Sequence, residues 1–339
     1  DNTGRRAAED ALRSAIHHAP EAAALQLVSS LVQPDASADD DEPTRELCAV
    51  LARRELPAML PRMASGGADS LRAGLLNALE GACSERLRRK IADTVGRIAS
   101  AMRETGGWPQ LNDYIARSAA PEAPAAHKFT VLCILEHMAG ALLCDWATCG
   151  EQVRSMLVGA LDGSTGQPAV AGAALGALTA LLRVAAEQEK LMTGKAERQQ
   201  CKAIAASLAP ALPAALSSLE SALGAADAGR VVATLDALVQ MADSQPRVFR
   251  PVLPKLLQGV CALASADSWL PVEGRLSCAE LLLTLAEGAP KLCGAPVLGY
   301  AGATLSLLLS MLIRLSNDAL DEWAEAAPAD GIDDAADDD

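Results

Sequence analysis

Cysteine and histidine side chains could give this chain metal-binding, redox or nucleophilic chemistry, which would depend on their spacing. The nine cysteines are scattered, mostly through apolar stretches, no CxxC pair occurs, and Cys144 and Cys149 are separated by four residues. Of the four histidines, His17 and His18 are adjacent and would point to different faces of a helix. The pattern predicts reduced structural thiols in an intracellular protein, without a metal site or a cofactor. A redox or metal role is the alternative.

Motifs that would bind a nucleotide phosphate or activate a serine are absent from the sequence. Gly194 and Lys195 are followed by Ala196, and Glu189 stands where a GxxxxGK loop needs its first glycine. The run from Gly163 to Gly166 has the wrong spacing for a G-x-S-x-G nucleophile elbow. We therefore predict no catalytic residue and a protein that is not an enzyme.

One group of carboxylates matches a sequence motif that is found in a class of enzymes. Asp333, Asp334 and Asp337 form a DDxxD sequence, with which α-helical prenyl-diphosphate enzymes hold Mg²⁺ on a helix that faces a cavity. Here the motif lies among Asp, Ala and Gly residues without an apolar period behind it. A disordered acidic segment explains it better, and the prenyl-diphosphate enzyme is kept as a remote alternative.

The negative charge of the chain is concentrated at one end. The formal net charge is −14, and residues 318–339 contain ten acidic side chains and neither Lys nor Arg. The preceding 317 residues therefore carry only −4. We interpret 318–339 as an acidic, disordered segment and expect no nucleic-acid partner, because phosphates would be repelled.

The elements that would position any site are organised by an internal repeat between Val231 and Ile313. Residues of the same kind recur at an offset of 44 positions, the distance between Pro246 and Pro290. The other matching pairs are Asp236 and Glu280, Leu238 and Leu282, Ala242 and Ala286, Asp243 and Glu287, and Arg247 and Lys291. A period of about 40 to 47 residues built from two helices is typical of a HEAT-repeat solenoid.

Composition supports this fold for residues 1–317. Half of the residues are apolar but only 2% are aromatic, so Ala and Leu must provide the core, as in closely packed helices. No internal boundary stands out. We predict an all-α, HEAT-repeat α-solenoid of about seven antiparallel helix pairs, which would be a monomer.

Three local patterns predict helix boundaries. A break at Ser65, Gly66 and Gly67 precedes a helix over 69–82, and Ser84 is a suitable N-cap for a helix that ends at Met102. Pro210 and Pro213 should bend a helix over 199–223 or start a turn within it.

The helix after Ser84 is unusually basic. Its cationic side chains are Arg86, Arg88, Arg89, Lys90 and Arg97. We interpret them as a solvated face that pairs in part with Glu85, Asp93 and Glu104. A docking patch for an acidic protein partner is the alternative.

An uncharged run from Cys293 to Ile313 is long enough to cross a bilayer. It contains two serines, one proline and three glycines, and it falls where the repeat needs a buried helix. We therefore expect a solenoid helix without membrane insertion, and the membrane span is the alternative.

Several segments together resemble the importin-β (karyopherin-β) superfamily of nuclear transport receptors. The amino-terminal ones are RELCAVLARRELPAML from Arg45 and SERLRRKIADTVGRIASAM from Ser84, followed by Trp108, Pro109 and Leu111. Further along, LDALVQMADSQPRVFRPVLPKLLQ, GRLSCAELLLTLAEGAPKL and the run from Asn317 to Trp323 are similar to the importin beta-3 (importin-5) branch. Receptors of this family are several times longer, so the resemblance implies an amino-terminal fragment.

The resemblance implies a nuclear import receptor segment that shuttles between cytoplasm and nucleus. Its amino-terminal repeats, here 1–117, would bind the GTPase Ran in the GTP form. Cargo with basic nuclear localisation signals would bind an acidic concave face lined by second helices, formed with the further repeats over 118–317. Nucleoporins are further implied partners. The Ran-facing candidates carried over by position are Asp69, Arg72, Asn77, Glu80, Asn112 and Asp113. The candidates for the acidic, cargo-binding segment are Asp318, Asp321, Glu322, Trp323, Glu325, Asp330, Asp333 and Asp334.

A Ran-independent HEAT-repeat scaffold for protein complexes is the main alternative function. It predicts partner binding that survives removal of the amino-terminal repeats, whereas the receptor hypothesis predicts binding that depends on the nucleotide held by Ran.

Overall fold

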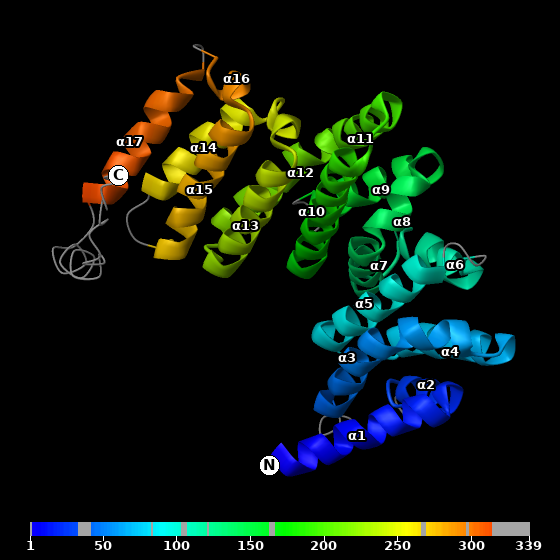
Figure 1. Cartoon of the computed structure of the whole chain (residues 1–339). Coiled ribbons are helices and arrows are strands. Elements are labelled where there is room, and N and C mark those ends of the chain that lie inside the picture. The colour runs from blue at the N-terminus through cyan, green and yellow to red at the C-terminus, as the bar shows by residue number, and fades with distance from the viewer. Residues whose placement is uncertain are drawn as a thin grey trace, which may run out of the picture.

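The computed structural model describes residues 2–32, 42–82, 84–102, 107–120, 122–162, 167–265, 269–295 and 298–313. Within these ranges the chain is helical and contains no strand. The all-α prediction is therefore confirmed. The helices stack one after another into a curved array, with the amino terminus at one end of the arc (Figure 1).

A continuous inner row of helices lies along the concave side of the arc (Figure 1). Each packs against the next member of the row, although an outer helix separates them in sequence. Their order is α3 (Glu42–Met59), α5 (Glu85–Met102), α7 (Ala125–His137), α10 (Pro168–Leu191), α13 (Ala228–Ser244) and α15 (Val272–Gly288). The second helix of each pair thus lines the concave side, as the solenoid hypothesis requires.

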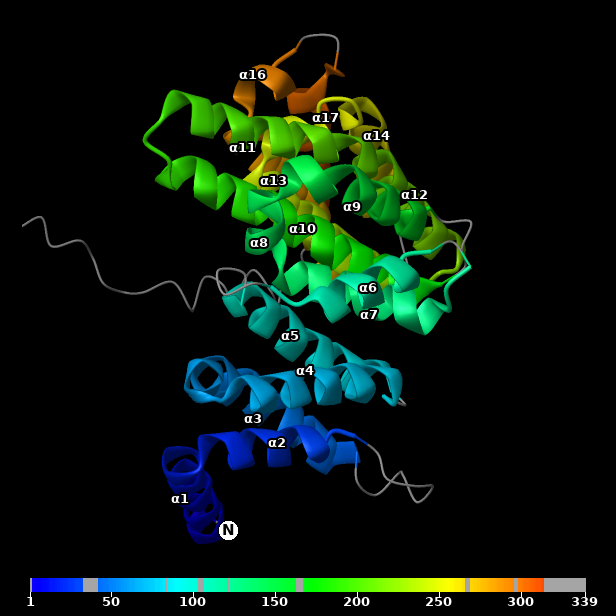
Figure 2. The same ribbon diagram turned by 90° about the vertical axis from the view of Figure 1, so that its right-hand side faces the viewer.

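The outer row covers the convex side and is less continuous, as two perpendicular views show (Figures 1 and 2). It comprises α2 (Pro20–Ser29), α4 (Ser65–Glu80), α6 (Pro109–Ser118), α8 (Ala139–Cys144), α9 (Trp146–Leu161), α11 (Lys195–Leu208), α12 (Leu212–Gly224), α14 (Leu253–Ser265) and α17 (Tyr300–Ile313). Helix α1 (Asn2–His18) packs on α2, and the single turn α16 (Pro290–Cys293) follows α15. Among the described residues, α4 and α6 hardly touch, and neither do α6 and α9.

A single hydrophobic core runs between the two rows from Ala24 to Leu307. Small residues build much of it, because Ala173, Ala174 and Ala177 on α10 are completely buried. Alanine allows the close approach of helices that a core with few aromatic residues requires. The repeat of 44 residues has a direct counterpart in space, since α13 and α15, which carry its two copies, pack side by side.

Buried arginines join the rows at the amino-terminal end. Arg45 on α3 donates through Nη2 to the carbonyl oxygen of Leu31 at 2.9 Å, just past the end of α2. Arg88 on α5 donates to the carbonyl oxygens of Leu79 and Ala82, at the end of α4. Both guanidinium groups thus satisfy carbonyls that have no partner inside their own helix.

The predicted boundaries are partly confirmed. Ser84 caps α5, since its Oγ accepts from the backbone nitrogen of Leu87 at 3.1 Å, and a 3₁₀ turn over Ala209–Ala211 interrupts the helix predicted to bend near Pro210. The break at Ser65 was wrong, because α4 begins there and includes Gly66 and Gly67. Gly67 packs so closely under the Glu21 carboxylate of α2 that a β-carbon would collide with it.

The run from Cys293 to Ile313 is not one helix. Helix α16 ends at Cys293, and α17 begins at Tyr300 with 14 residues, fewer than the roughly 20 that a bilayer needs. Two other described segments, Pro168–Leu191 and Lys195–Gly224, are long and apolar enough for a span. They pack against their neighbours in the solenoid, and 72% and 50% of their most apolar windows are buried.

Candidate functional site

The inner row provides a continuous surface on which another molecule could be held, and its charge changes along the array. Cationic side chains outnumber carboxylates on α5 and equal them on α3, whereas carboxylates outnumber cations on α13 and α15.

The basic part is organised around two nearly buried carboxylates. Asp93 on α5 accepts from Arg53 Nη1 at 2.6 Å and from Arg97 Nε at 2.8 Å, and His137 Nδ1 of α7 lies 3.4 Å away. The side chain of Asp93 is only 8% exposed. This cluster therefore links three inner helices, α3, α5 and α7, through a single carboxylate.

The second carboxylate is Glu46 on α3. It pairs with Arg86 Nε at 2.9 Å and with Lys90 Nζ at 2.5 Å, both on α5. Each of the two carboxylates thus faces two permanent cations, and the surface formed by Arg53, Arg86, Lys90 and Arg97 keeps a net positive charge.

The basic helix after Ser84 is not one uniform solvated face. Arg88 is buried and satisfies the end of α4, so it belongs to neither a solvated face nor a docking patch. Arg89 is exposed and lies over the ring of Phe129, with its guanidinium carbon 5.9 Å from the ring centroid. Sequence reasoning missed the burial of Arg88 because its acceptor carbonyls come from another helix.

The acidic part consists of exposed carboxylates that recur with the repeat. Asp236 and Asp243 lie one heptad apart on α13, and Glu273, Glu280 and Glu287 continue at the same spacing on α15. Residues seven apart lie on nearly the same face of a helix. None of the five takes part in an ion pair with another described residue. We call these five residues the acidic ladder.

The acidic ladder was missed as a candidate site. The 44-residue repeat already showed that Asp236 corresponds to Glu280 and Asp243 to Glu287. That correspondence was the available signal, because equivalent positions on neighbouring repeats must line the same side of a solenoid.

The Ran-facing candidates are all on outer helices. Asp69, Asn77 and Glu80 are exposed on α4, and Asn112 and Asp113 are exposed on α6. Arg72 on α4 is half-buried and pairs with Asp69 at 2.8 Å. The structure does not bring the two helices into close contact and places neither set in the inner row (Figure 1).

The cargo candidates from Asp318 to Asp334, together with the DDxxD motif, lie outside the described residues. Glu104 and the run from Gly163 to Gly166 do so as well.

The described residues show no arrangement suited to metal or thiol chemistry. They contain no cluster of three or more His, Cys, Asp or Glu side chains that could hold a metal ion. The eight cysteines in the described part of the chain form no disulfide with one another. Burial raises the pKa of Cys133 to about 11 and that of Cys278 to about 12, which keeps both thiols protonated and unreactive near neutral pH.

Comparison with known proteins identifies the family. The model of the IPO5-like family with TPR repeats matches residues 83–259, more than half of the chain. The period of 44 residues is nevertheless that of HEAT repeats rather than the 34 residues of a TPR unit. No curated protein sequence matches the chain.

Solved structures of the karyopherin Kap121p share the fold. Kap121p alone superposes with a TM-score of 0.75 at 20% sequence identity, over 98% of this chain and 30% of that chain. Kap121p bound to RanGTP gives 0.73 at 19% identity, over 98% and 29% of the two chains. Kap121p bound to Nup53p gives 0.74 at 20% identity, over 98% and 30%. The present chain thus spans about 30% of the length of Kap121p. With the family model and the solenoid in agreement, the chain belongs to the IPO5-like family of the importin-β superfamily.

Proposed function

We propose that this chain is part of a nuclear import receptor, in which the amino-terminal repeats bind Ran in the GTP form and the concave face holds basic cargo segments. Membership of the IPO5-like family supports this proposal, and so does the Kap121p structure with RanGTP. The receptor would act in both cytoplasm and nucleus and would contact nucleoporins, as Kap121p does with Nup53p.

The change of charge sign along the inner row is the observation that carries the cargo part of the proposal. Lys- and Arg-rich segments are attracted to unpaired carboxylates, and the acidic ladder offers five on two adjacent helices. The proposed cargo surface therefore includes the ladder as well as the acidic segment from Asp318 onward. Contacts of this kind weaken as salt screens them.

Two surfaces are available for Ran at the amino-terminal end. One is the outer set on α4 and α6, for which the candidates are Asp69, Arg72, Asn77, Glu80, Asn112 and Asp113. The other is the inner basic surface around Asp93, where Arg86 and Arg97 are more than half exposed. The inner surface carries two clusters of charges, around Asp93 and Glu46, that together join three helices, and we therefore favour it.

The test is a pull-down of purified Ran loaded with a non-hydrolysable GTP analogue or with GDP. We expect retention of the GTP form only, and equal or absent binding of both forms would contradict the Ran proposal for this chain. Binding of another protein partner that is unchanged by the presence of Ran would instead favour the scaffold function.

Two sets of substitutions distinguish the proposed Ran surfaces. Arg86→Gln with Arg97→Gln alters the inner surface, and Asp69→Asn with Glu80→Gln and Asp113→Asn alters the outer set. Loss of Ran binding in the first variant alone would assign the inner face, and loss in the second alone would assign the outer row.

A further inference from the structure

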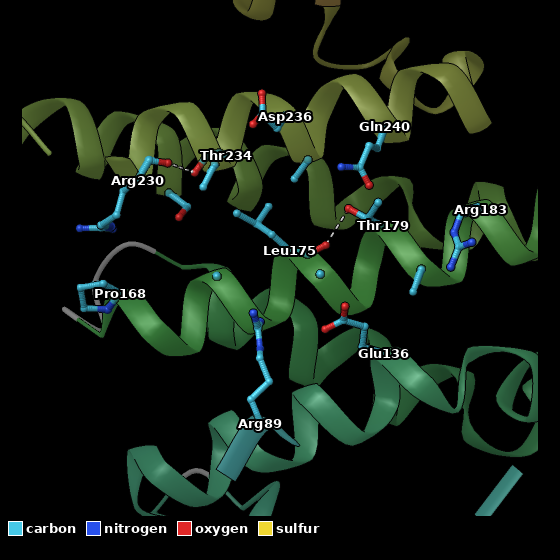
Figure 3. Close-up of a pocket in the computed structure, with 16 residues that line it drawn as sticks. Arg89, Glu136, Pro168, Leu175, Thr179, Arg183, Arg230, Thr234, Asp236 and Gln240 are labelled. Atoms are coloured by element: carbon cyan, nitrogen blue, oxygen red, sulfur yellow. Dashed lines mark hydrogen bonds between the residues drawn. The ribbon is translucent and has the colours of Figure 1, made fainter. Parts of the chain in front are cut away.

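The space between the outer helices α6 and α9 differs in chemistry from the concave cavity between α10 and α13 (Figure 3). The charged side chains that line the concave cavity are Arg89, Arg183, Arg230, Glu136 and Asp236. Cations and carboxylates are mixed there, and Asp236 belongs to the acidic ladder, so the cavity is part of the charged inner row. The space between α6 and α9 is mainly apolar, and neither the inner Ran surface nor the basic cargo accounts for it.

Two hollows of about 640 and 530 Å³ join into one groove between α6 and α9. They meet at Ala116 on α6 and at Gln152 and Met156 on α9, since these residues line both hollows. Leu132 and Leu135 of the inner helix α7 are buried and lie at the bottom. The groove is therefore open down to the inner row, which agrees with the scarce contact between α6 and α9.

The wall on α9 is a single face of the helix. Its lining residues follow helical spacing, from Thr148 through Gln152 and Met156 to Gly159. At a rise of about 1.5 Å per residue, the groove follows α9 for about 16 Å. An incoming helix would need about 12 residues to cover that length.

The apolar side chains of the groove are not fully covered. Those that line it and are only half-buried are Ile115, Met138, Leu142 and Met156. The two unbranched methionines can adapt to the shape of an apolar partner. Gly159 is exposed, and a β-carbon there would meet no atom within 4 Å, so another backbone can approach α9 closely.

The groove has no net charge, but its two ends differ in sign. Among its lining residues only Lys128 and Asp145 are charged. Lys128 lines the hollow that contains Gly159, whereas Asp145 lines the other hollow, just before the start of α9. Outside the lining, Glu151 and Arg154 of α9 pair with each other. Helix α6 also carries one carboxylate and one arginine, neither of which lines the groove.

We propose that the α6–α9 groove binds an amphipathic helix of a partner protein. A helix satisfies its own backbone hydrogen bonds, so a mainly apolar groove can hold it, whereas an extended peptide would bring unpaired backbone groups. An acidic side chain at the amino end of the helix would lie against Lys128, and a basic one at its carboxyl end against Asp145. The bound helix would thus run antiparallel to α9. Acids in the first turn and bases in the last turn also stabilise the helix itself.

The acidic segment of the chain itself does not fit this groove. It follows α17, which lies far along the array from α6 (Figure 1), and its ten carboxylates do not match a groove with one lysine. The proposed partner differs from basic cargo and binds on the other side of the array. Of the outer Ran candidates, Asn112 lines the groove, so Ran would compete with the helix only if the outer set held Ran.

The first test measures binding of a helical peptide to the whole chain by fluorescence anisotropy. The peptide is Ser-Glu-Ala-Leu-Gln-Ala-Leu-Leu-Gln-Ala-Leu-Lys, with blocked ends and fluorescein on a Gly-Ser linker. The same peptide with proline in place of its last two alanines keeps the leucines and charges but is not helical. We expect the helical peptide to bind at least about tenfold more tightly. Equal affinity, or no binding of the helical peptide, would overturn the proposal.

A charge exchange tests how the helix lies in the groove. A second peptide has its Glu and Lys exchanged, and the protein variant Lys128→Glu with Asp145→Lys exchanges the charges of the groove. We expect each protein to prefer the peptide that matches its ends, by about threefold. The helicity of each free peptide is the same with either protein, so the change of preference reports the groove alone. The same preference in both proteins would contradict the proposed orientation.

Paired glycine variants locate the binding site. Gly159→Gln should block the groove and weaken binding about tenfold or more. Gly259→Gln on the outer helix α14 is the control, because Gly259 is also exposed and a β-carbon there also meets no atom within 4 Å. Unchanged binding by the Gly159 variant would contradict the assignment. Sedimentation of the free proteins tests a second copy as the occupant: a dimer that Gly159→Gln abolishes would overturn the partner proposal.

Discussion

Arg88 on an inner helix donates to the carbonyl oxygen of Leu79 on the preceding outer helix at 2.8 Å. Arg45 makes the corresponding contact with Leu31 one repeat earlier, 43 positions before Arg88. The join between the two rows is thus polar as well as hydrophobic at the amino-terminal end.

Replacing Arg88 should destabilise this part of the solenoid. Arg88→Met leaves the carbonyls of Leu79 and Ala82 buried without this donor and should lower the free energy of unfolding by about 2–3 kcal/mol. Urea denaturation followed by circular dichroism measures the change. Arg86→Met on the same helix is the control, since Arg86 is 75% exposed and its loss should cost less than about 0.5 kcal/mol. Equal effects of the two substitutions would contradict the capping role.

The Asp93 cluster should show measurable coupling. A double-mutant cycle with Asp93→Asn and Arg97→Gln is expected to give an interaction energy of about 1 kcal/mol, because the carboxylate is nearly buried although the arginine is half exposed. The exposed pair Glu151 and Arg154 on α9 is the control and should give less than about 0.5 kcal/mol. Coupling no greater than that of the control pair would show that the cluster does not stabilise the inner row.

Two glycines on inner helices should respond to alanine in opposite ways. At Gly96 a β-carbon would lie 2.7 Å from His137 Cβ and 3.0 Å from the carbonyl oxygen of Ile134, so Gly96→Ala should cost about 1–3 kcal/mol. At Gly172 it would meet nothing, and the higher helix propensity of alanine should stabilise the fold by up to about 1 kcal/mol. Thermal denaturation of both variants checks the prediction, which a stabilised Gly96→Ala protein would refute.

The acidic ladder should bind basic peptides. Asp236→Asn with Glu280→Gln is expected to weaken binding of a fluorescein-labelled nine-residue Lys-Arg peptide about tenfold, and the difference should shrink as salt rises. Asp113→Asn with Glu122→Gln removes two exposed carboxylates outside the ladder and should have little effect. Equal losses in both double variants would show that net charge, rather than the ladder, controls binding.

Alkaline pH should destabilise the fold through its buried thiols. Unfolded cysteine ionises near pH 8.5, whereas burial raises the pKa of Cys133 to about 11 and of Cys278 to about 12. The folded state therefore keeps these protons to a higher pH than the unfolded state does. The contribution of the two protonated thiols to the free energy of unfolding is complete below about pH 8.5 and is lost as pH rises toward 11. We expect the free energy of unfolding to fall less between pH 8 and pH 10 for Cys133→Ala than for the unaltered chain. Urea denaturation at both pH values measures it. An unchanged difference would count against this role for Cys133.

The sequence predicted the architecture better than the site, for physical reasons. Leu238 and Leu282 occupy equivalent positions because each inner helix must bury the same face. This requirement produces a periodic pattern in the sequence, so the fold could be predicted from it. Gly67 was misread as part of a break, because its close packing against Glu21, 46 positions away, cannot be read from the neighbouring residues. Likewise, whether Asp69 on α4 lies inside or outside the arc depends on the curvature of the whole array.

The discontinuity of the outer row has a mechanical consequence. The inner helices touch without interruption from α3 to α15, whereas α4 and α6, and then α6 and α9, leave the convex side poorly connected within the described residues. When such an array bends, the contacts within the inner row are kept, and the distances between neighbouring outer helices increase or decrease. A change in curvature therefore disturbs few packed contacts, and the concave face can adapt its radius to the size of what it holds.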